Sequence, residues 1–148
     1  MSRNEKDYSD YIQHSSNISN FLSLVYGFVF TAITILLTQL SAPSSLQSQI
    51  ILFFLTVLFN VYRYLLDWNL TMTTHYCEMP PLRREITIFN RVLFISGNLL
   101  GSAIVLMFFL WNLVYLALVS GVVYLLRVAL SYVFIIRPFQ KHRRKLSS

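Results

Sequence analysis

The chain has 148 residues, of which 55% are hydrophobic and only 12% are charged, and its formal net charge is +6. This length allows one domain at most, and the composition excludes an ordinary soluble protein and indicates a membrane protein. A single cysteine, Cys77, excludes an intrachain disulfide and a metal site built on paired cysteines. The basic residues flank apolar segments, so the charge indicates orientation in a membrane and attraction to anionic lipid headgroups, not nucleic-acid binding.

Residues 1–20 are polar and mixed in charge. Their apolar side chains are spaced so that they would share one side of a helix: Tyr8, Tyr11, Ile12 and Ile18. Such a helix could rest on the membrane surface, whereas the high serine and asparagine content is typical of a disordered tail. Both interpretations stay open for this segment.

Residues 21–40 contain no charge and predict the first transmembrane helix. Small and hydroxyl side chains recur within it at helical spacing: Gly27, Thr31, Thr34 and Thr38. Because small side chains let a neighbouring backbone come close, we expect this stripe to face other helices, with leucine and phenylalanine facing lipid. Packing is favoured over the alternative that the stripe lines a permeation path.

The second predicted span covers residues 46–66, and its lower end is polar. Asn60, Arg63 and Asp67 share one helix face with Thr56. Arg63 and Asp67 are four residues apart, so they can pair within the helix, and Arg63 can alternatively extend to the headgroups.

Residues 67–87 are predicted to be the one long loop. His75, Cys77 and Glu78 could suggest a metal site, but their spacing matches no standard zinc pattern and further ligands are distant. We expect a solvated loop that ends in a pair of basic, headgroup-binding residues, Arg83 and Arg84.

Residues 92–136 contain only one charge, Arg127. As one helix they would extend roughly 68 Å, more than twice a bilayer core of about 30 Å, so the segment has to fold back. The break is expected at Trp111-Asn112, which leaves spans at 91–110 and 113–136. Gly97 and Gly101 form a small-xxx-small pair that predicts close helix contact, with the first span or with another copy.

Polar side chains share one face of the fourth span: Ser120, Tyr124, Arg127 and Ser131. A basic tail follows at 137–148. Its charges are expected to bind anionic lipid headgroups: Arg137, Lys141, Arg143, Arg144 and Lys145.

The predicted fold is therefore all-α, a polytopic membrane protein with four transmembrane helices arranged as two hairpins. Four spans place both termini on one side with the 67–87 loop. That side carries nine basic residues, while the two opposite turns carry none: Arg3, Lys6, Arg83, Arg84, Arg137, Lys141, Arg143, Arg144 and Lys145. The positive-inside rule then predicts cytoplasmic termini.

Helix rise places Asn60, Asn98 and Arg127 at a similar depth, roughly 10 to 15 Å from the cytoplasmic edge. An arginine at that depth has to face protein or water. Together with Arg63 and Tyr124, these residues are candidates for a ligand or ion path, and the excess of positive charge suits an anion, a lipid phosphate or a carboxylated ligand. The alternative is that they only hold helices together.

Two functions follow from these expectations. The first is a homo-oligomeric channel or pore in which Arg127 favours anions, and the alternative is an accessory or scaffolding subunit of a larger membrane complex. An enzyme is disfavoured because the sequence has no nucleophile with a base at recognisable spacing, no paired carboxylates and no phosphate-binding glycine loop. No catalytic residue, metal site or cofactor is expected, and the expected partners are lipids and other membrane subunits.

The topology makes a prediction about glycosylation. Asn17-Ile18-Ser19 and Asn69-Leu70-Thr71 match the acceptor pattern, but both would face the cytoplasm and stay unmodified. Expression with glycosylation-competent microsomes, followed by glycosidase treatment, should leave the electrophoretic mobility unchanged. A mobility shift at either site would overturn the predicted orientation.

Overall fold

The computed structural model describes residues 3–39, 45–76 and 80–137, although not every side chain within them. The chain forms four long helices, and the last continues into a short π-helix. They are α1 (Arg3–Gln39), α2 (Leu46–Tyr76), α3 (Pro80–Leu110), α4 (Val114–Leu130) and η1 (Ser131–Ile136).

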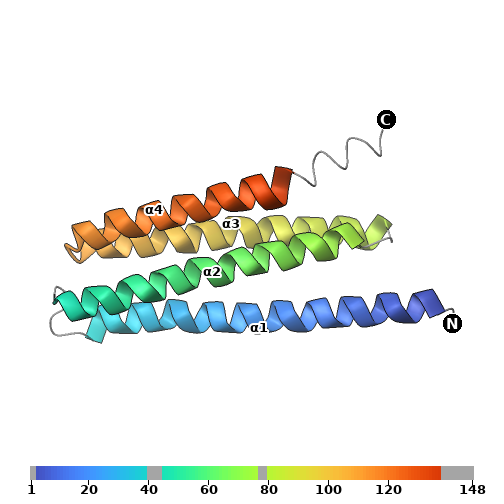
Figure 1. The fold of residues 1–148 in the computed structure, drawn as a ribbon, viewed down its shortest axis with the longest axis horizontal. Helices are drawn as coiled ribbons and strands as arrows, with labels where there is room; N and C mark the ends of the chain where they lie inside the picture. Colours follow the sequence, from blue (N-terminus) through green and yellow to red (C-terminus); the bar gives the residue numbers. More distant parts are fainter. Residues whose placement is uncertain (1–2, 40–44, 77–79, 138–148) are drawn as a thin grey trace.

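The helices run side by side along the long axis of the molecule (Figure 1). The end of α1, the start of α2 and the α3–α4 turn lie at one end of the bundle, and α1 begins at the opposite end, toward which η1 runs. Helix α2 is central, because it packs against α1, α3, α4 and η1. The chain is thus two helical hairpins, joined mainly through α2.

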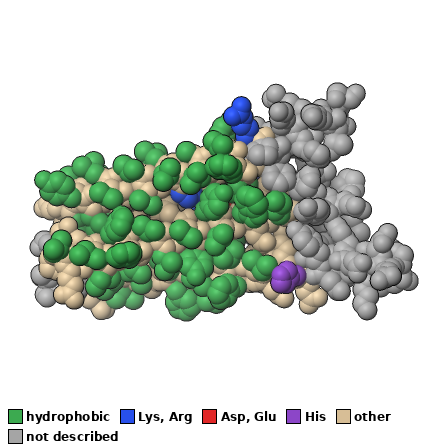
Figure 2. Space-filling model, in the orientation of Figure 1, with side chains coloured by type: hydrophobic (Ala, Val, Ile, Leu, Met, Phe, Trp, Pro, Cys, Tyr) green, Lys and Arg blue, Asp and Glu red, His purple; other side chains and the backbone are tan. Residues whose placement is uncertain are grey.

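Four helical segments are long and apolar enough to cross a membrane: Gln13–Gln39, Leu46–Thr73, Arg91–Leu110 and Val114–Ile135. Hydrophobic side chains cover most of the face seen in Figure 2. Such an exterior suits lipid, since a water-soluble protein of this size does not expose a continuous apolar surface. The prediction of an all-helical chain with four candidate spans is confirmed.

Residues 3–20 belong to α1, which runs without interruption from Arg3 to Gln39. A polar contact fastens this part of α1 to α2. Asn69 Nδ2 donates to the Ser15 carbonyl at 2.9 Å and to Ser19 Oγ at 2.8 Å, and the Ser15 and Thr73 hydroxyls also bond to each other. The polar side chains of this part of α1 therefore find hydrogen-bond partners on α2.

The prediction of a long loop at 67–87 is wrong, because α2 continues to Tyr76 and α3 begins at Pro80. Polar side chains of this segment bond to their own helix: the hydroxyls of Thr71 and Thr73 each donate to a carbonyl four residues earlier, at 2.8 Å. Proline is also favourable in the first turn of a helix, where no amide donor is needed. Of the expected loop, only residues 77–79, which include Cys77, lie outside the described residues.

The predicted break at Trp111-Asn112 is confirmed. Asn112 has a φ of 57°, in the left-handed region that asparagine tolerates better than most residues. The Leu113 amide then donates to the Phe108 carbonyl at 2.9 Å, which closes the end of α3 and starts the return of the chain in α4.

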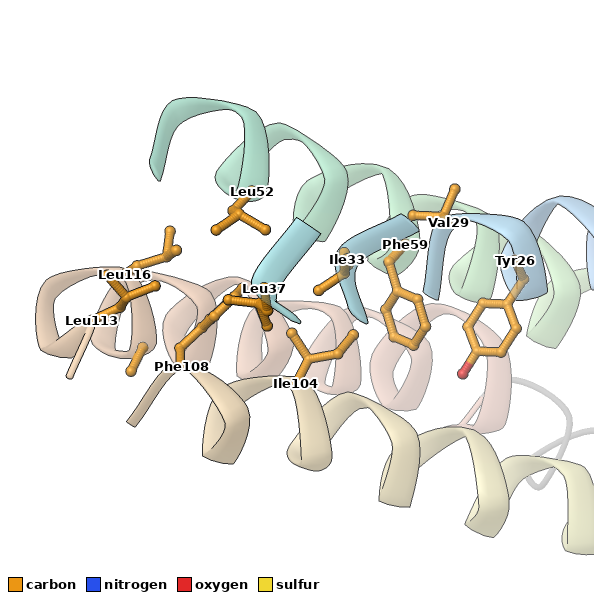
Figure 3. Close-up of a cluster of buried hydrophobic side chains, with 11 residues drawn as sticks. Tyr26, Val29, Ile33, Leu37, Leu52, Phe59, Ile104, Phe108, Leu113 and Leu116 are labelled. Atoms are coloured by element: carbon orange, nitrogen blue, oxygen red, sulfur yellow. The ribbon is translucent and has the colours of Figure 1, made fainter. Parts of the chain in front are cut away.

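The apolar core fills the bundle on the side of the two hairpin turns (Figure 3). Every helix contributes: α1 supplies Tyr26, Val29, Ile33 and Leu37, α2 supplies Leu52 and Phe59, α3 supplies Ile104 and Phe108, and α4 supplies Leu116 and Ala117, to which Leu113, just before α4, is added. The Tyr26 and Phe59 rings stack with centroids 4.4 Å apart, which fixes α1 against α2.

The stripe of small residues on α1 lies on the outer surface of the bundle. Gly27, Thr31 and Thr38 are exposed and Thr34 is half-buried, which differs from the expectation that they face the other helices of the chain. Each threonine hydroxyl donates to a carbonyl four residues earlier at 3.0 Å, so none needs a neighbouring helix. A Cβ at Gly27 would meet no described atom within 4 Å.

Candidate functional site

Three charged side chains are buried between α2 and α4, below the apolar core. Arg63 is 2% exposed, Arg127 4% and Asp67 6%. We refer to these three residues as the charge cluster. Its members come from two hairpins, so it forms only when the whole bundle is assembled.

Arg63 turns into the bundle instead of extending to the headgroups. Its Nη2 donates to Asp67 Oδ1 at 2.7 Å and to the Leu93 carbonyl of α3 at 2.9 Å. The predicted pairing of Arg63 with Asp67 within α2 is confirmed, and the bond to Leu93 also ties α2 to α3.

Arg127 completes the cluster from α4. Its Nη1 donates to Asp67 Oδ2 at 3.3 Å and its Nη2 to Asn98 Oδ1 at 2.8 Å. Asn98 is oriented for this contact, because its Nδ2 donates to the Phe94 carbonyl at 2.8 Å and its oxygen is left to accept. The Asp67 carboxylate therefore bridges the two guanidinium groups, one on each oxygen.

Two tyrosine rings lie against the guanidinium groups. Arg63 Cζ is 5.9 Å from the centre of the Tyr26 ring, and Arg127 Cζ is 5.4 Å from that of Tyr124. Their hydroxyls donate to α3, Tyr26 to the Gly97 carbonyl at 3.5 Å and Tyr124 to the Asn98 carbonyl at 3.3 Å. The rings offset part of the positive charge by cation–π attraction and bring α1 into the site.

Gly97 and Gly101 make room for side chains. Both are buried, and a Cβ on Gly97 would fall on the guanidinium of Arg63, with Nη1 only 2.6 Å away. A Cβ on Gly101 would lie 2.7 Å from Cε2 of Tyr124. The two glycines were expected to bring a helix of the first span or of another copy close, whereas here they receive side chains from α2 and α4.

The structure brings Arg63, Asn98, Tyr124 and Arg127 together, but Asn60 stays apart from them. Its Nδ2 donates to the Thr56 carbonyl of its own helix at 2.9 Å, and its Oδ1 is buried without a partner among the described residues. Asp67, which accepts from both arginines, was not among the predicted site residues. Asp67 could have been identified as a site residue, because it is the one acidic residue next to a predicted span. The spacing of residues in the sequence did not indicate Tyr26.

Most of the residues that were expected to bind lipid headgroups lie outside what the structure describes. Arg137 is exposed at the end of η1. The side chains of Arg83 and Arg84 and the residues Lys141, Arg143, Arg144 and Lys145 lie outside what the structure describes.

The charge cluster pairs one carboxylate with two guanidinium groups, and the two arginines keep their positive charge. What the arrangement can do is join helices and present positive charge. Comparisons with models of protein families, with curated proteins and with solved structures find no match, so function has to be argued from this geometry.

Asp67→Asn should destabilise the bundle by about 3 to 5 kcal/mol, because two buried guanidinium groups would lose their carboxylate. The free energy of unfolding can be measured by titrating the detergent-solubilised protein with sodium dodecyl sulfate. Exposed Arg91 offers a control, and Arg91→Gln should change stability by no more than about 0.5 kcal/mol. Equal, small effects of the two substitutions would contradict the central role of Asp67.

Gly97→Ala should cost about 1 to 3 kcal/mol, because the new methyl group displaces the Arg63 guanidinium from its bonds to Asp67 and Leu93. The same alanine should cost much less in an Arg63→Ala background, where no guanidinium is present. Gly121→Ala is a matched control, since its Cβ would meet Val105 at an ordinary 3.9 Å. Additive effects of Gly97→Ala and Arg63→Ala in the double variant would disprove the contact.

Proposed function

We propose that the chain is a non-catalytic structural subunit of a membrane assembly. The observation that supports this role is the burial and internal pairing of the charge cluster: Arg63, Asp67 and Arg127 are all at most 6% exposed and bond to one another. A polar group that lines an ion path has to be open to that path, whereas these three side chains are enclosed and bond to one another. Here the polar groups are used to hold α2, α3 and α4 in one arrangement.

An ion path through Arg127 of a single chain has little support. Its guanidinium contacts Asp67, Asn98 and the Tyr124 ring, all from the same chain. Between the charge cluster and the end of the bundle that holds the α3–α4 turn, the apolar core fills the space between the helices, and Ile33, Leu37 and Leu52 are fully buried. A monomer of this kind is a packed bundle, which suits a structural subunit better than an ion channel.

An assembly role needs a surface that another helix can approach closely. The outer stripe of α1 is such a surface, because Gly27, Thr31 and Thr38 are exposed and Gly27 has open space at its Cβ position. In lipid, helices associate through packing of small residues, since apolar surface alone gives no preference for protein over lipid tails. The remainder of the α1 exterior is bulky, with Leu24, Phe28 and other large apolar side chains exposed.

The second candidate is the homo-oligomeric pore. The same outward position of Thr31 and Thr38 favours it, since hydroxyls on the outside of the bundle would line a path between subunits if α1 faced the symmetry axis. In that arrangement, Arg127 would influence permeation only through its field, because it is enclosed by its own chain.

The assembly role predicts that Gly27→Ile separates the chain from its assembly. In native membranes solubilised with mild detergent, the wild type should migrate on blue-native gels well above its 17.3 kDa monomer, and the substitution should reduce the assembled fraction about tenfold, or ~1.4 kcal/mol. Ala129, exposed on α4, provides a matched small-to-large control in Ala129→Leu, which should leave migration unchanged.

The pore candidate is separated by the mass of the purified chain and by bilayer recordings. The structural role predicts no conductance from wild type or from Arg127→Gln. A homo-oligomer of defined mass whose ion selectivity changes in Arg127→Gln, while its assembly survives, would replace the structural role with the pore.

A further inference from the structure

We propose that the charge cluster binds one small monovalent anion of the halide type, held by the Nε–H donors of Arg63 and Arg127. This inference concerns the interior of a single chain and goes beyond the proposed structural role. A bundle that assembles with other subunits can lack the anion, and one that holds the anion can remain a monomer.

The first argument is the charge balance of the site. Two guanidinium groups share one carboxylate, and Asp67 is the only carboxylate among the side chains that the structure describes. Arginine does not lose its proton in proteins, so the excess of one positive charge stays when the bundle closes. Within α3, Glu85 lies eight residues before Leu93, whose carbonyl accepts from Arg63, which is about 12 Å of helix rise, and its side chain is outside those that the structure describes.

The second argument is a pair of buried hydrogen-bond donors. Nε of Arg63 and Nε of Arg127 are both buried and have no acceptor among the described residues. Other nitrogens of these guanidinium groups are engaged, Arg63 Nη2 with Asp67 and Leu93, and Arg127 Nη1 and Nη2 with Asp67 and Asn98. Charged donors enclosed in an apolar bundle strongly favour a charged acceptor, because bulk water does not reach them.

The tyrosine rings do not remove this requirement. Tyr26 and Tyr124 offset part of the positive charge through their faces, but a neutral ring adds no negative charge to the site. The amide of Asn98 likewise supplies one neutral acceptor, and Arg127 Nη2 already uses it.

The burial of the site selects the class of anion. Because both arginines are at least 96% buried, the headgroup of a lipid, with its chains attached, has no approach to their Nε atoms. A monovalent ion matches the single excess charge. It also loses less hydration free energy on entering an apolar interior than a divalent phosphate or sulfate would.

Asn98→Asp is the decisive variant. Nε and Nη2 lie on the same edge of a guanidinium, and Arg127 Nη2 already contacts the Asn98 side-chain oxygen, so a carboxylate at this position can accept from both donors. It would also make the cluster neutral. The carboxylate introduced by Asn98→Asp should therefore take the place of the bound anion.

The test measures the melting temperature of the detergent-solubilised chain, followed by tryptophan fluorescence, in sodium chloride or sodium bromide against sodium gluconate at constant ionic strength. The wild type should melt at a temperature that rises with halide and reaches a plateau. Asn98→Asp should melt higher than the wild type in gluconate and should lose the halide dependence. Arg127→Gln, which also removes the excess charge, should lose it too, while Arg91→Gln should retain it.

A direct measurement of anion binding to the wild-type protein tests the proposal even if a variant fails to fold. Equilibrium dialysis of the wild-type protein with radioactive chloride should saturate near one ion per chain. No saturable binding overturns the proposal, as does a halide effect that is the same in all variants. A melting temperature that depends on anionic lipid and not on halide would likewise overturn the proposal.

Discussion

Asp67 is the point at which the two hairpins are joined. Its oxygens accept from Arg63 of its own helix and from Arg127 of α4, while Arg63 also reaches the Leu93 carbonyl of α3. Removing a charge from water is costly, and the bonds of a buried pair repay that cost only when the geometry is good. These bonds therefore tie α2, α3 and α4 to one another at this level of the bundle.

The rest of the site is arranged around that geometry. Gly97 gives space to one guanidinium and Gly101 to the ring that lies against the other, so two positions that look like a helix-packing motif serve side-chain packing. Asn98, between them, orients its oxygen toward Arg127. One short stretch of α3 thus acts as a socket for residues of α2 and α4, which explains why α3 needs small residues at these positions.

The spans were predictable because length and apolar composition determine them, and the break at Asn112 was predictable because an apolar run of that length cannot cross once. The helical state of residues 67–76 and 80–87 was not predicted, although the Thr71 hydroxyl bonds to its own helix and Asn69 bonds to α1. Arg127 stood out as a lone charge. Its choice of Asp67 over Asn60, and the inward turn of Arg63, depend on how helices rotate about their axes, which spacing within one helix does not determine.

The separation of charges between the hairpins has a consequence for membrane insertion. Arg63 and Asp67 sit one turn apart on α2, so the first hairpin enters the bilayer with its charges already paired. The second hairpin carries Arg127 with only neutral partners of its own, Asn98 and Tyr124, and an unpaired arginine costs about 2.5 to 3.5 kcal/mol at the centre of a span. The bond to Asp67 therefore offsets part of the cost of placing Arg127 in the membrane, and this compensation requires both hairpins.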